Sequence, residues 1–266
     1  MIIIFRAVNF VFDGVNSSKY GLVISELDFN ASTEVTGIAD LTIETYTARR
    51  NNKHHMIGFT EDEIMTFSMS FNSVGFVPID RRYLSEINTW LFNQPSYKKL
   101  QILQRDLNDV FFMCRLVSVQ QEMLNDEIIG FKCTVECDNN CAYEHTRTIT
   151  YDLSDNETTK TFVFNNRSTS IYGLKPTIEF TLSEGTGLTI NNTTTGVQTV
   201  FTGLQQLDTI TMDNENQIIT AESGNNVSDC FNCNFVNLKR GLNTLVITGK
   251  CSSFTLQYQN QRKVGG

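Results

Sequence analysis

The pattern of apolar residues predicts one amphipathic helix in a chain that otherwise favours strands. From Asp80 to Asn93 the apolar residues recur with the helical period. They form one stripe, which consists of Tyr83, Leu84, Ile87, Trp90 and Leu91. Asp80 is placed to cap the first turn, and Pro95 follows closely enough to end the helix. No second helix is predicted, so we expect strands to cover this stripe, with Trp90 in the core of the first domain.

Alternation of apolar and polar residues predicts strands in the rest of the first half. The clearest are residues 65–72, where Met and Phe alternate with Thr, Ser and Asn, and residues 129–137. We expect each of these two strands to be buried on one face. Further strands are predicted at Met1–Phe12, Leu22–Phe29 and Ile38–Tyr46, with a turn at Asp13-Gly14 and a hairpin of Lys98–Leu103 with Val110–Val119.

A polar stretch, Ala48–Glu63, interrupts these strands and is predicted to be a long exposed connection or arm. Its charges are divided by Gly58. Arg49, Arg50, Lys53, His54 and His55 precede the glycine, and Glu61, Asp62 and Glu63 follow it. Two interpretations remain open, a solvated loop and a surface that docks a partner or a second copy of the chain.

The composition changes near Thr146, which predicts two domains, residues 1–147 and 148–266. In the second domain charges become rarer, while Thr and Asn increase. Short strands at regular spacing, with turn signals between them, are typical of a β-sandwich. They are predicted at Thr161–Phe164, Thr177–Leu182, Leu188–Ile190, Thr199–Phe201, Leu207–Met212, Gln217–Thr220, Leu242–Thr248 and Phe254–Tyr258, with Gly185, Gly187 and Gly249 among the breaks.

The cysteines do not form a convincing metal or redox site. Cys133, Cys137 and Cys141 are four residues apart, but in a strand that spacing separates residues by about 13 Å. Ligands of one zinc ion must lie within about 2.3 Å of it. We therefore interpret Cys133 and Cys137 as buried apolar groups. Cys230-x-x-Cys233 lacks a second pair and a following helix, so we interpret it as structural as well.

Other catalytic signatures are missing from the sequence. His54 and His55 are adjacent and His145 is isolated; no nucleophile elbow or P-loop occurs, and Gly185-Thr186-Gly187 lacks the rest of a dinucleotide motif. We predict no enzyme activity, catalytic residue, cofactor or metal. For sugar binding, Tyr172 and Tyr258 are the large platforms of the second domain, and Tyr258 is expected in the core because it lies in an alternating strand.

Charge and composition restrict the partners. The chain has 266 residues, 40% of them hydrophobic, and a net charge of −8. This balance opposes specific binding to nucleic acid or an anionic membrane, since either needs a basic patch. Met1–Phe5 is the longest strongly apolar run, so neither a signal peptide nor a membrane span is expected. Seven cysteines fit free thiols in a reducing compartment.

Several short motifs together resemble a known family. They are Phe12-Asp13-Gly14, Ser18–Leu22, Trp90-Leu91, Lys98–Leu100 and Phe111–Val119 in the first part, and Pro176–Glu179 and Leu238–Leu245 in the second. As a set they are similar to those of the distal tail proteins of long, flexible-tailed bacteriophages. The resemblance implies a mainly β fold: an N-terminal β-sandwich-like domain with one packed α-helix, then a C-terminal galectin-like β-sandwich.

The resemblance also implies a structural role in the virion. Six copies would form a ring at the tail tip, after assembly in the host cytoplasm, and DNA would pass through its lumen. The implied partners are further copies of the chain, the tail tube protein, the tail-tip protein and, in some phages, receptor-binding proteins. Two alternatives remain: a carbohydrate-binding adhesion module acting through the second sandwich, and an enzyme with an accessory sandwich.

Overall fold

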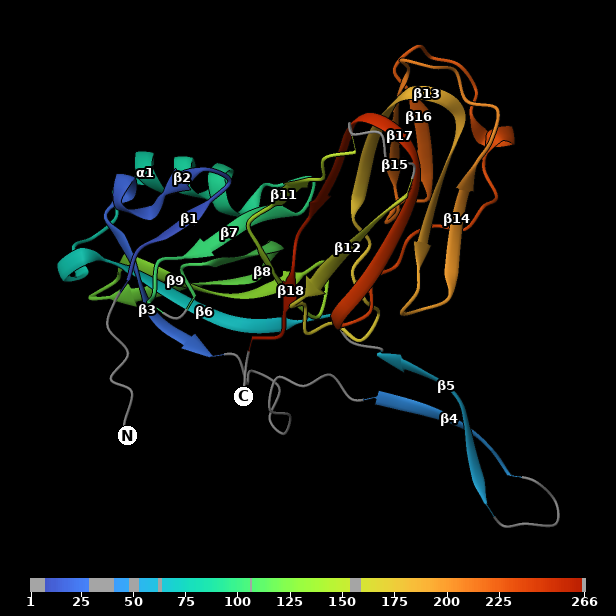
Figure 1. The fold of residues 1–266 in the computed structure, drawn as a ribbon. Helices are drawn as coiled ribbons and strands as arrows, with labels where there is room; N and C mark the ends of the chain where they lie inside the picture. The colour runs from blue at the N-terminus through green and yellow to red at the C-terminus, as the bar shows by residue number, and fades with distance from the viewer. Residues whose placement is uncertain are drawn as a thin grey trace. The chain divides into compact units, whose positions relative to one another are not determined.

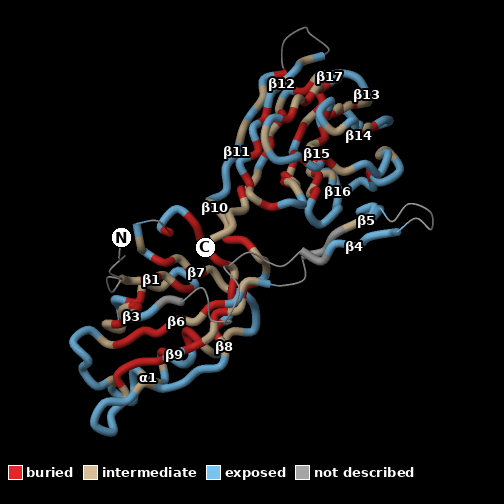
Figure 2. Tube along the Cα trace, turned by 90° about the horizontal axis from the view of Figure 1, so that it is seen from below, coloured by how far each residue is buried: buried red, intermediate tan, exposed pale blue. Residues whose placement is uncertain are grey.

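The computed structural model describes residues 8–28, 41–47, 53–61, 64–105, 107–153 and 159–264, which fold into two compact units. Unit 1 comprises Met1–Tyr143 and Lys263–Gly266, and unit 2 comprises Glu144–Arg262. Strands dominate both units (Figure 1), and each unit buries its own hydrophobic cluster (Figure 2). The prediction of a mainly β chain with one α-helix is confirmed within these residues.

An antiparallel sheet forms the body of unit 1. Its strands lie in the order β2-β1-β7-β8-β9-β6-β3, and β10 also pairs with β8. The bounds are β1 Phe10–Phe12, β2 Val15–Asn16, β3 Leu22–Asp28, β6 Thr66–Ser73, β7 Lys98–Ile102, β8 Val110–Leu124, β9 Glu127–Cys137 and β10 Ala142–Glu144. Asp13 and Gly14 both have positive φ, which matches the predicted tight turn between β1 and β2. The predicted hairpin is also present, as β7 and β8.

The predicted helix begins and ends where the sequence indicates, but its second half has a different geometry. α1 spans Arg81–Ile87, and the Arg82 N–H donates to the Asp80 carboxylate at 2.8 Å. The chain then forms a π-helical turn, η3 (Asn88–Phe92), closed by the Asn93 N–H on the Asn88 carbonyl at 3.0 Å. The apolar repeat does not distinguish an α-turn from this wider turn.

The helix packs its stripe on the sheet through Ile87, Trp90 and Leu91, which are all buried. Trp90 is 8% exposed, and its ring stacks with that of Phe10 at a centroid distance of 5.9 Å. Its indole N–H donates to the Phe12 carbonyl at 2.9 Å. The core position predicted for Trp90 is confirmed. Tyr83 was wrongly assigned to the buried stripe. It is 51% exposed, because it lies in the first turn of the helix at the edge of the stripe.

Strand β6 is buried more completely than its alternating pattern predicts. The apolar residues face the core as expected, but the polar Ser70 and Asn72 are buried too. Asn72 is paired with Gly130 of β9. A Cβ on Gly130 would overlap the Asn72 side chain, so the missing side chain of the glycine leaves the space that Asn72 occupies. Alternation alone cannot report such a cross-strand fit.

Two strands pair only with each other among the described residues. β4 (Leu41–Thr47) and β5 (His54–Glu61) form a two-stranded ribbon, which we call the β-ribbon (Figure 1). The stretch 48–63 was predicted to be a long exposed connection or arm, and half of it is strand β5, which no strand prediction included. An isolated ribbon exposes both faces, so it does not need the alternation that marks a half-buried strand.

Unit 2 contains a second antiparallel sheet, ordered β11-β17-β13-β15-β16, in which β12 pairs with β17 and β14 with β13. The bounds are β11 Arg147–Thr150, β12 Thr159–Asn166, β13 Thr177–Asn192, β14 Val197–Phe201, β15 Thr209–Asp213, β16 Ile218–Ala221 and β17 Gly241–Tyr258. The short strand β18 (Gln261–Arg262) is not part of this sheet; it pairs with β10. Phe180, Phe201 and Phe254 lie in its core.

Two predicted breaks in unit 2 are bends inside long strands. β13 continues through Gly185 and Gly187, and β17 continues through Gly249. Register shifts between Thr181 and Thr189 accommodate extra residues, and Gly185 and Gly249 have φ angles of 78° and 137°. Glycine inside a strand can mark a bulge as well as an end, and here it marks bulges. The galectin-like character of this unit stays a prediction.

Candidate functional site

The β-ribbon presents apolar side chains to solvent. Apart from the half-buried Gly58, every ribbon residue whose exposure is described lies at the surface. The large apolar ones, Ile43, Tyr46, Met56 and Ile57, are 54–71% exposed. A two-stranded ribbon is marginally stable alone in water, and clustered exposed apolar groups typically mark an interaction site. The β-ribbon is therefore a candidate docking element.

The pairing register places apolar groups on both faces of the ribbon. Thr45 pairs with Met56, so Met56 shares a face with Thr45 and with Ile43, two residues earlier. Tyr46 pairs with His55 on the opposite face. A partner that covers a single face would leave the other apolar set in water, so the ribbon is suited to insertion between two surfaces.

The predicted arm residues fall in and around this ribbon. Lys53, His54 and His55 are exposed at the start of β5, where His54 Nδ1 lies 3.1 Å from the Thr47 hydroxyl. Glu61 is the last residue of β5. Arg49, Arg50, Asp62 and Glu63 lie outside the described residues. A docking role for this set stays a prediction.

A second exposed apolar surface was missed by the sequence reasoning. It consists of Val74, Phe76, Val77, Met123 and Leu124, which are 49–62% exposed. We call it the end surface. The first three belong to or follow the turn η2 (Val74–Phe76), and the last two end β8. The sequence did contain a signal for this surface. Large apolar residues follow strand β6 before the helix, in a run that contains Gly75 and ends at Pro78.

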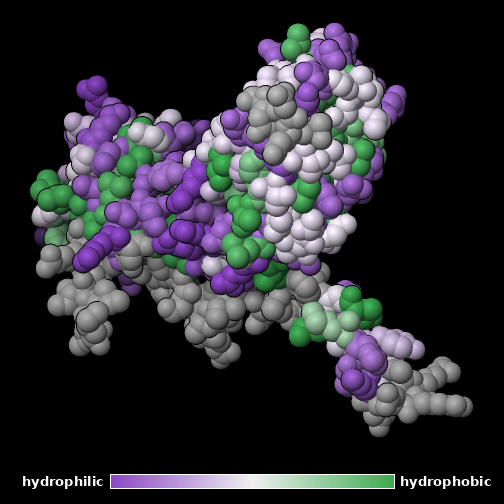
Figure 3. Space-filling model, in the orientation of Figure 1, coloured by the Kyte–Doolittle hydropathy of each residue, from purple (hydrophilic) through white to green (hydrophobic). Residues whose placement is uncertain are grey.

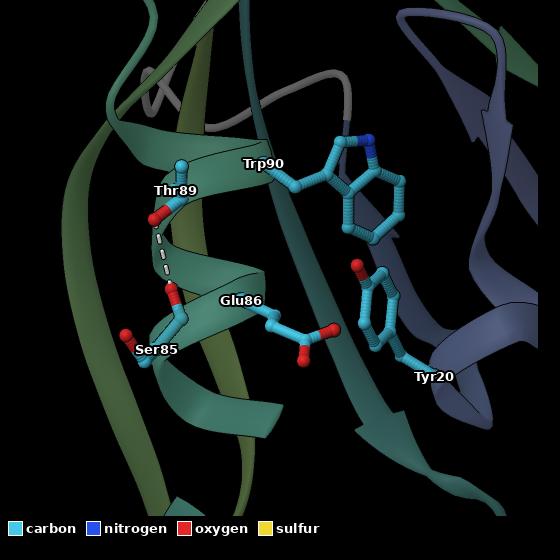
Figure 4. Close-up of a pocket in the computed structure, with 5 residues that line it drawn as sticks. All are labelled: Tyr20, Ser85, Glu86, Thr89 and Trp90. Atoms are coloured by element: carbon cyan, nitrogen blue, oxygen red, sulfur yellow. Dashed lines mark hydrogen bonds between the residues drawn. The ribbon is translucent and has the colours of Figure 1, made fainter. Parts of the chain in front are cut away.

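A hollow lies between the helix and Tyr20 (Figure 4). Its volume is about 340 Å³, and Ser85, Glu86, Thr89, Trp90 and Tyr20 line it. The Thr89 hydroxyl donates to the Ser85 carbonyl at 3.0 Å, and Glu86 lies 3.6 Å from Arg82 in an exposed ion pair. The lining residues thus supply no nucleophile paired with a base, and the geometry indicates no reaction there.

The cysteine positions agree with the structural interpretation of Cys133 and Cys137. Both are buried, and burial raises the pKa of each thiol to about 12. Thiols with such a pKa stay protonated at neutral pH and are poor nucleophiles and ligands. Cys230 is half-buried and Cys233 is exposed. No group of three or more His, Cys, Asp or Glu residues suited to a metal occurs among the residues described.

The tyrosines weighed for sugar binding differ in burial. Tyr258 is half-buried and packs edge-on against Phe164 at 4.9 Å, beside the core of unit 2. Tyr172 is 48% exposed. In the parts of the chain that the structure describes, no helix has the length and hydropathy to span a membrane.

Comparison with known proteins identifies the class. The model of a phage tail protein N-terminal domain matches residues 5–139, and that of a phage tail C-terminal domain matches residues 141–258. The chain belongs to this family of phage tail proteins and is a structural component of a tail. No curated protein matches the sequence significantly.

Solved structures agree on the fold. The crystal structure of SPP1 Dit (gp 19.1), described as a paradigm of the hub adsorption apparatus in phages that infect Gram-positive bacteria, matches with a TM-score of 0.67 and 11% identity. The match covers 96% of this chain and 99% of Dit. A chain of the phage P2 baseplate in its activated conformation matches with a TM-score of 0.50 and 8% identity, over 98% of this chain and 99% of that one. The resemblance to distal tail proteins is confirmed.

Proposed function

We propose that this chain is a distal tail protein whose copies form a hexameric ring between the tail tube and the tail tip. The observation that carries the proposal is the similarity to SPP1 Dit over nearly the full length of both chains. Both units of this chain take part in the match. A protein that shared one domain with a tail hub would not show this coverage.

The exposed surfaces support self-assembly. A closed ring of identical subunits joins two different surfaces of each copy at every contact. This chain offers two exposed apolar surfaces that differ in structure, the β-ribbon and the end surface. Covering them removes apolar area from water, which favours association by about 25 cal/mol per Å².

The charge of the chain fits a channel for DNA. With a net charge of −8 per subunit, a ring of six carries many more acidic than basic groups. An acidic wall repels phosphate, so DNA passes through the lumen without binding to it. On this proposal the partners are the tail tube protein, the tail-tip protein and, where the phage has them, receptor-binding proteins. The ring is assembled in the host cytoplasm and retained in the virion.

The mass of the purified chain in solution tests the ring. We expect light scattering after size exclusion to give six times the 30.2 kDa of one chain, or twelve times for two stacked rings. The same sample should not be retained on a glycan array. A monomer at all concentrations would contradict the ring, and a monomer retained by glycans would favour the adhesion module.

A further inference from the structure

Two buried cysteines lie directly opposite each other in the sheet of unit 1. Cys114 of β8 pairs with Cys137 of β9, and both are free thiols in the hydrophobic core. Figure 3 shows many hydrophilic residues on the visible face of unit 1, whereas these two side chains are at most 1% exposed. The spacing of cysteines along the sequence gave no sign of this pair, because its two members lie on different strands.

The hydrogen bonds beside the pair show that the two backbones approach closely. In an antiparallel ladder, opposite residues alternate between hydrogen-bonded pairs, with Cα atoms about 5.5 Å apart, and non-hydrogen-bonded pairs, about 4.5 Å apart. The Asp138 N–H donates to the Met113 carbonyl at 2.9 Å, so the hydrogen-bonded position lies one residue beyond the cysteines. The Cys137 N–H donates to the Met65 carbonyl instead, at 3.0 Å. Cys114 and Cys137 therefore form a non-hydrogen-bonded pair.

A non-hydrogen-bonded pair has the spacing that a disulfide needs. Disulfides join residues whose Cα atoms are about 4.4–6.8 Å apart, and the separation of about 4.5 Å lies within that range. The β-carbons are also closer in these pairs than in hydrogen-bonded ones. Cys133 is too far along β9 to take the place of Cys137, since four residues of a strand span about 13 Å. The sulfur atoms of Cys114 and Cys137 can thus be joined with little movement of the strands.

Burial makes the two thiols slow to react. It raises the pKa of Cys137 to about 12, and burial together with the neighbouring Cys137 raises the pKa of Cys114 well above its usual value. Thiols react as thiolates, and core strands open rarely, so oxidation is slow. The chain is a structural component of a phage tail and leaves the cell with the virion. It thereby passes from a reducing cytosol to an oxidising medium.

We propose that Cys114 and Cys137 form a cross-strand disulfide after the virion leaves the cell. The oxidant is a small-molecule disulfide in the medium. One cysteine thiolate attacks its sulfur–sulfur bond, forms a mixed disulfide and releases a small thiolate. The second cysteine thiolate attacks the sulfur of the first and releases the other small thiolate. The two released thiolates take up the two cysteine protons, so two cysteines are oxidised and one small disulfide is reduced.

The bond fastens β8 to β9 in the middle of the sheet. It closes the β8–β9 hairpin into a covalent loop, which restricts the unfolded chain and so stabilises unit 1. The stabilisation appears only outside the cell, where the tail no longer has to be assembled. This inference goes beyond the proposed ring and does not depend on it, because both cysteines belong to one chain.

Peptide mapping of the oxidised chain tests the bond. The full chain is purified with a reductant and transferred to glutathione disulfide until the exposed Cys233 has lost its free thiol. Remaining thiols are alkylated in denaturant, and the chain is cleaved with trypsin and a protease that cuts after glutamate. Cys114 then lies in residues 106–115, Cys133 in 133–136 and Cys137 in 137–144. We expect 106–115 joined to 137–144, and a higher urea midpoint for Trp90 fluorescence than in the reduced chain.

Cys137→Ala and Cys133→Ala are matched variants, because each removes a buried thiol from the same face of β9. Cys133→Ala should keep the joined peptides and the rise in midpoint on oxidation, and Cys137→Ala should lose both. Fragmentation of the joined peptides distinguishes Cys137 from Cys141, which share residues 137–144. Alkylation of both Cys114 and Cys137 in the oxidised wild type, or a bond from Cys114 to any other cysteine, would refute the inference.

Discussion

Replacing Trp90 with alanine is expected to lower the free energy of unfolding of unit 1 by about 3–5 kcal/mol. The indole contacts Phe10, Phe12 and Tyr20, which come from the strand β1 and the turn η1 (Ser17–Tyr20). Its removal opens a cavity between helix and sheet, and the Phe12 carbonyl loses its indole donor. Since domains are typically stable by about 5–15 kcal/mol, this loss brings unit 1 close to unfolding.

Hydrogen exchange followed by mass spectrometry measures this effect for each unit separately. Peptides from β1, β6 and β9 should lose protection in Trp90→Ala, while peptides from β13 and β17 keep it. Trp90→Phe is the matched control: it retains a ring against Phe10 and should lose much less protection. Unchanged exchange in β1 and β6 of the alanine variant would show that the indole does not hold the helix on the sheet.

Replacing Gly130 with alanine is expected to lower the free energy of unfolding of unit 1, although the change adds only one methyl group. We expect a loss near the upper end of about 1–3 kcal/mol. The new Cβ would overlap the Asn72 side chain and lie 2.5 Å from the Phe71 carbonyl oxygen. Asn72 is buried, and the carbonyl belongs to the backbone of the neighbouring strand, so neither moves away freely. The strands β6 and β9 must separate locally to accept the methyl group.

Urea denaturation followed by the fluorescence of Trp90, the single tryptophan, reports this change within unit 1. Gly58→Ala is the control, because the nearest atom to its new Cβ is the flexible Glu44 carboxylate at 3.3 Å. We expect its denaturation midpoint to match that of the wild type. A Gly130→Ala midpoint equal to both would mean that β6 and β9 are less closely packed than the structure indicates.

The sequence predicted structure correctly where the order of neighbouring residues determines the local backbone. The helical repeat up to Leu91, the Asp80 cap and the alternation in β9 led directly to observed elements. Cys133 and Cys137 were placed correctly because strand geometry separates them. Each of these inferences depends on the local backbone geometry and on a single buried face. The pattern of neighbouring residues in the sequence reveals both.

The missed features depend on contacts between distant segments. Asn72 is buried because Gly130 lies opposite, 58 positions along the chain. Gly185 and Gly249 form bulges instead of breaks because β13 and β17 pair with each other on both sides of the shift. The exposure of Phe76 follows from its left-handed backbone and from the neighbouring β8–β9 hairpin. Neither the π-helical turn at Asn88 nor strand β5 of the β-ribbon has a distinctive local pattern, whereas β4 overlaps the strand predicted at Ile38–Tyr46.

The position of the chain in the virion tests the central claim most directly. Virions of the phage that encodes it are labelled with an antibody raised against the purified chain and examined by electron microscopy. A distal tail protein predicts label at the end of the tail remote from the capsid, at the junction of tube and tip. Label along the tube, at the neck or on the capsid would contradict a hub at the tail tip.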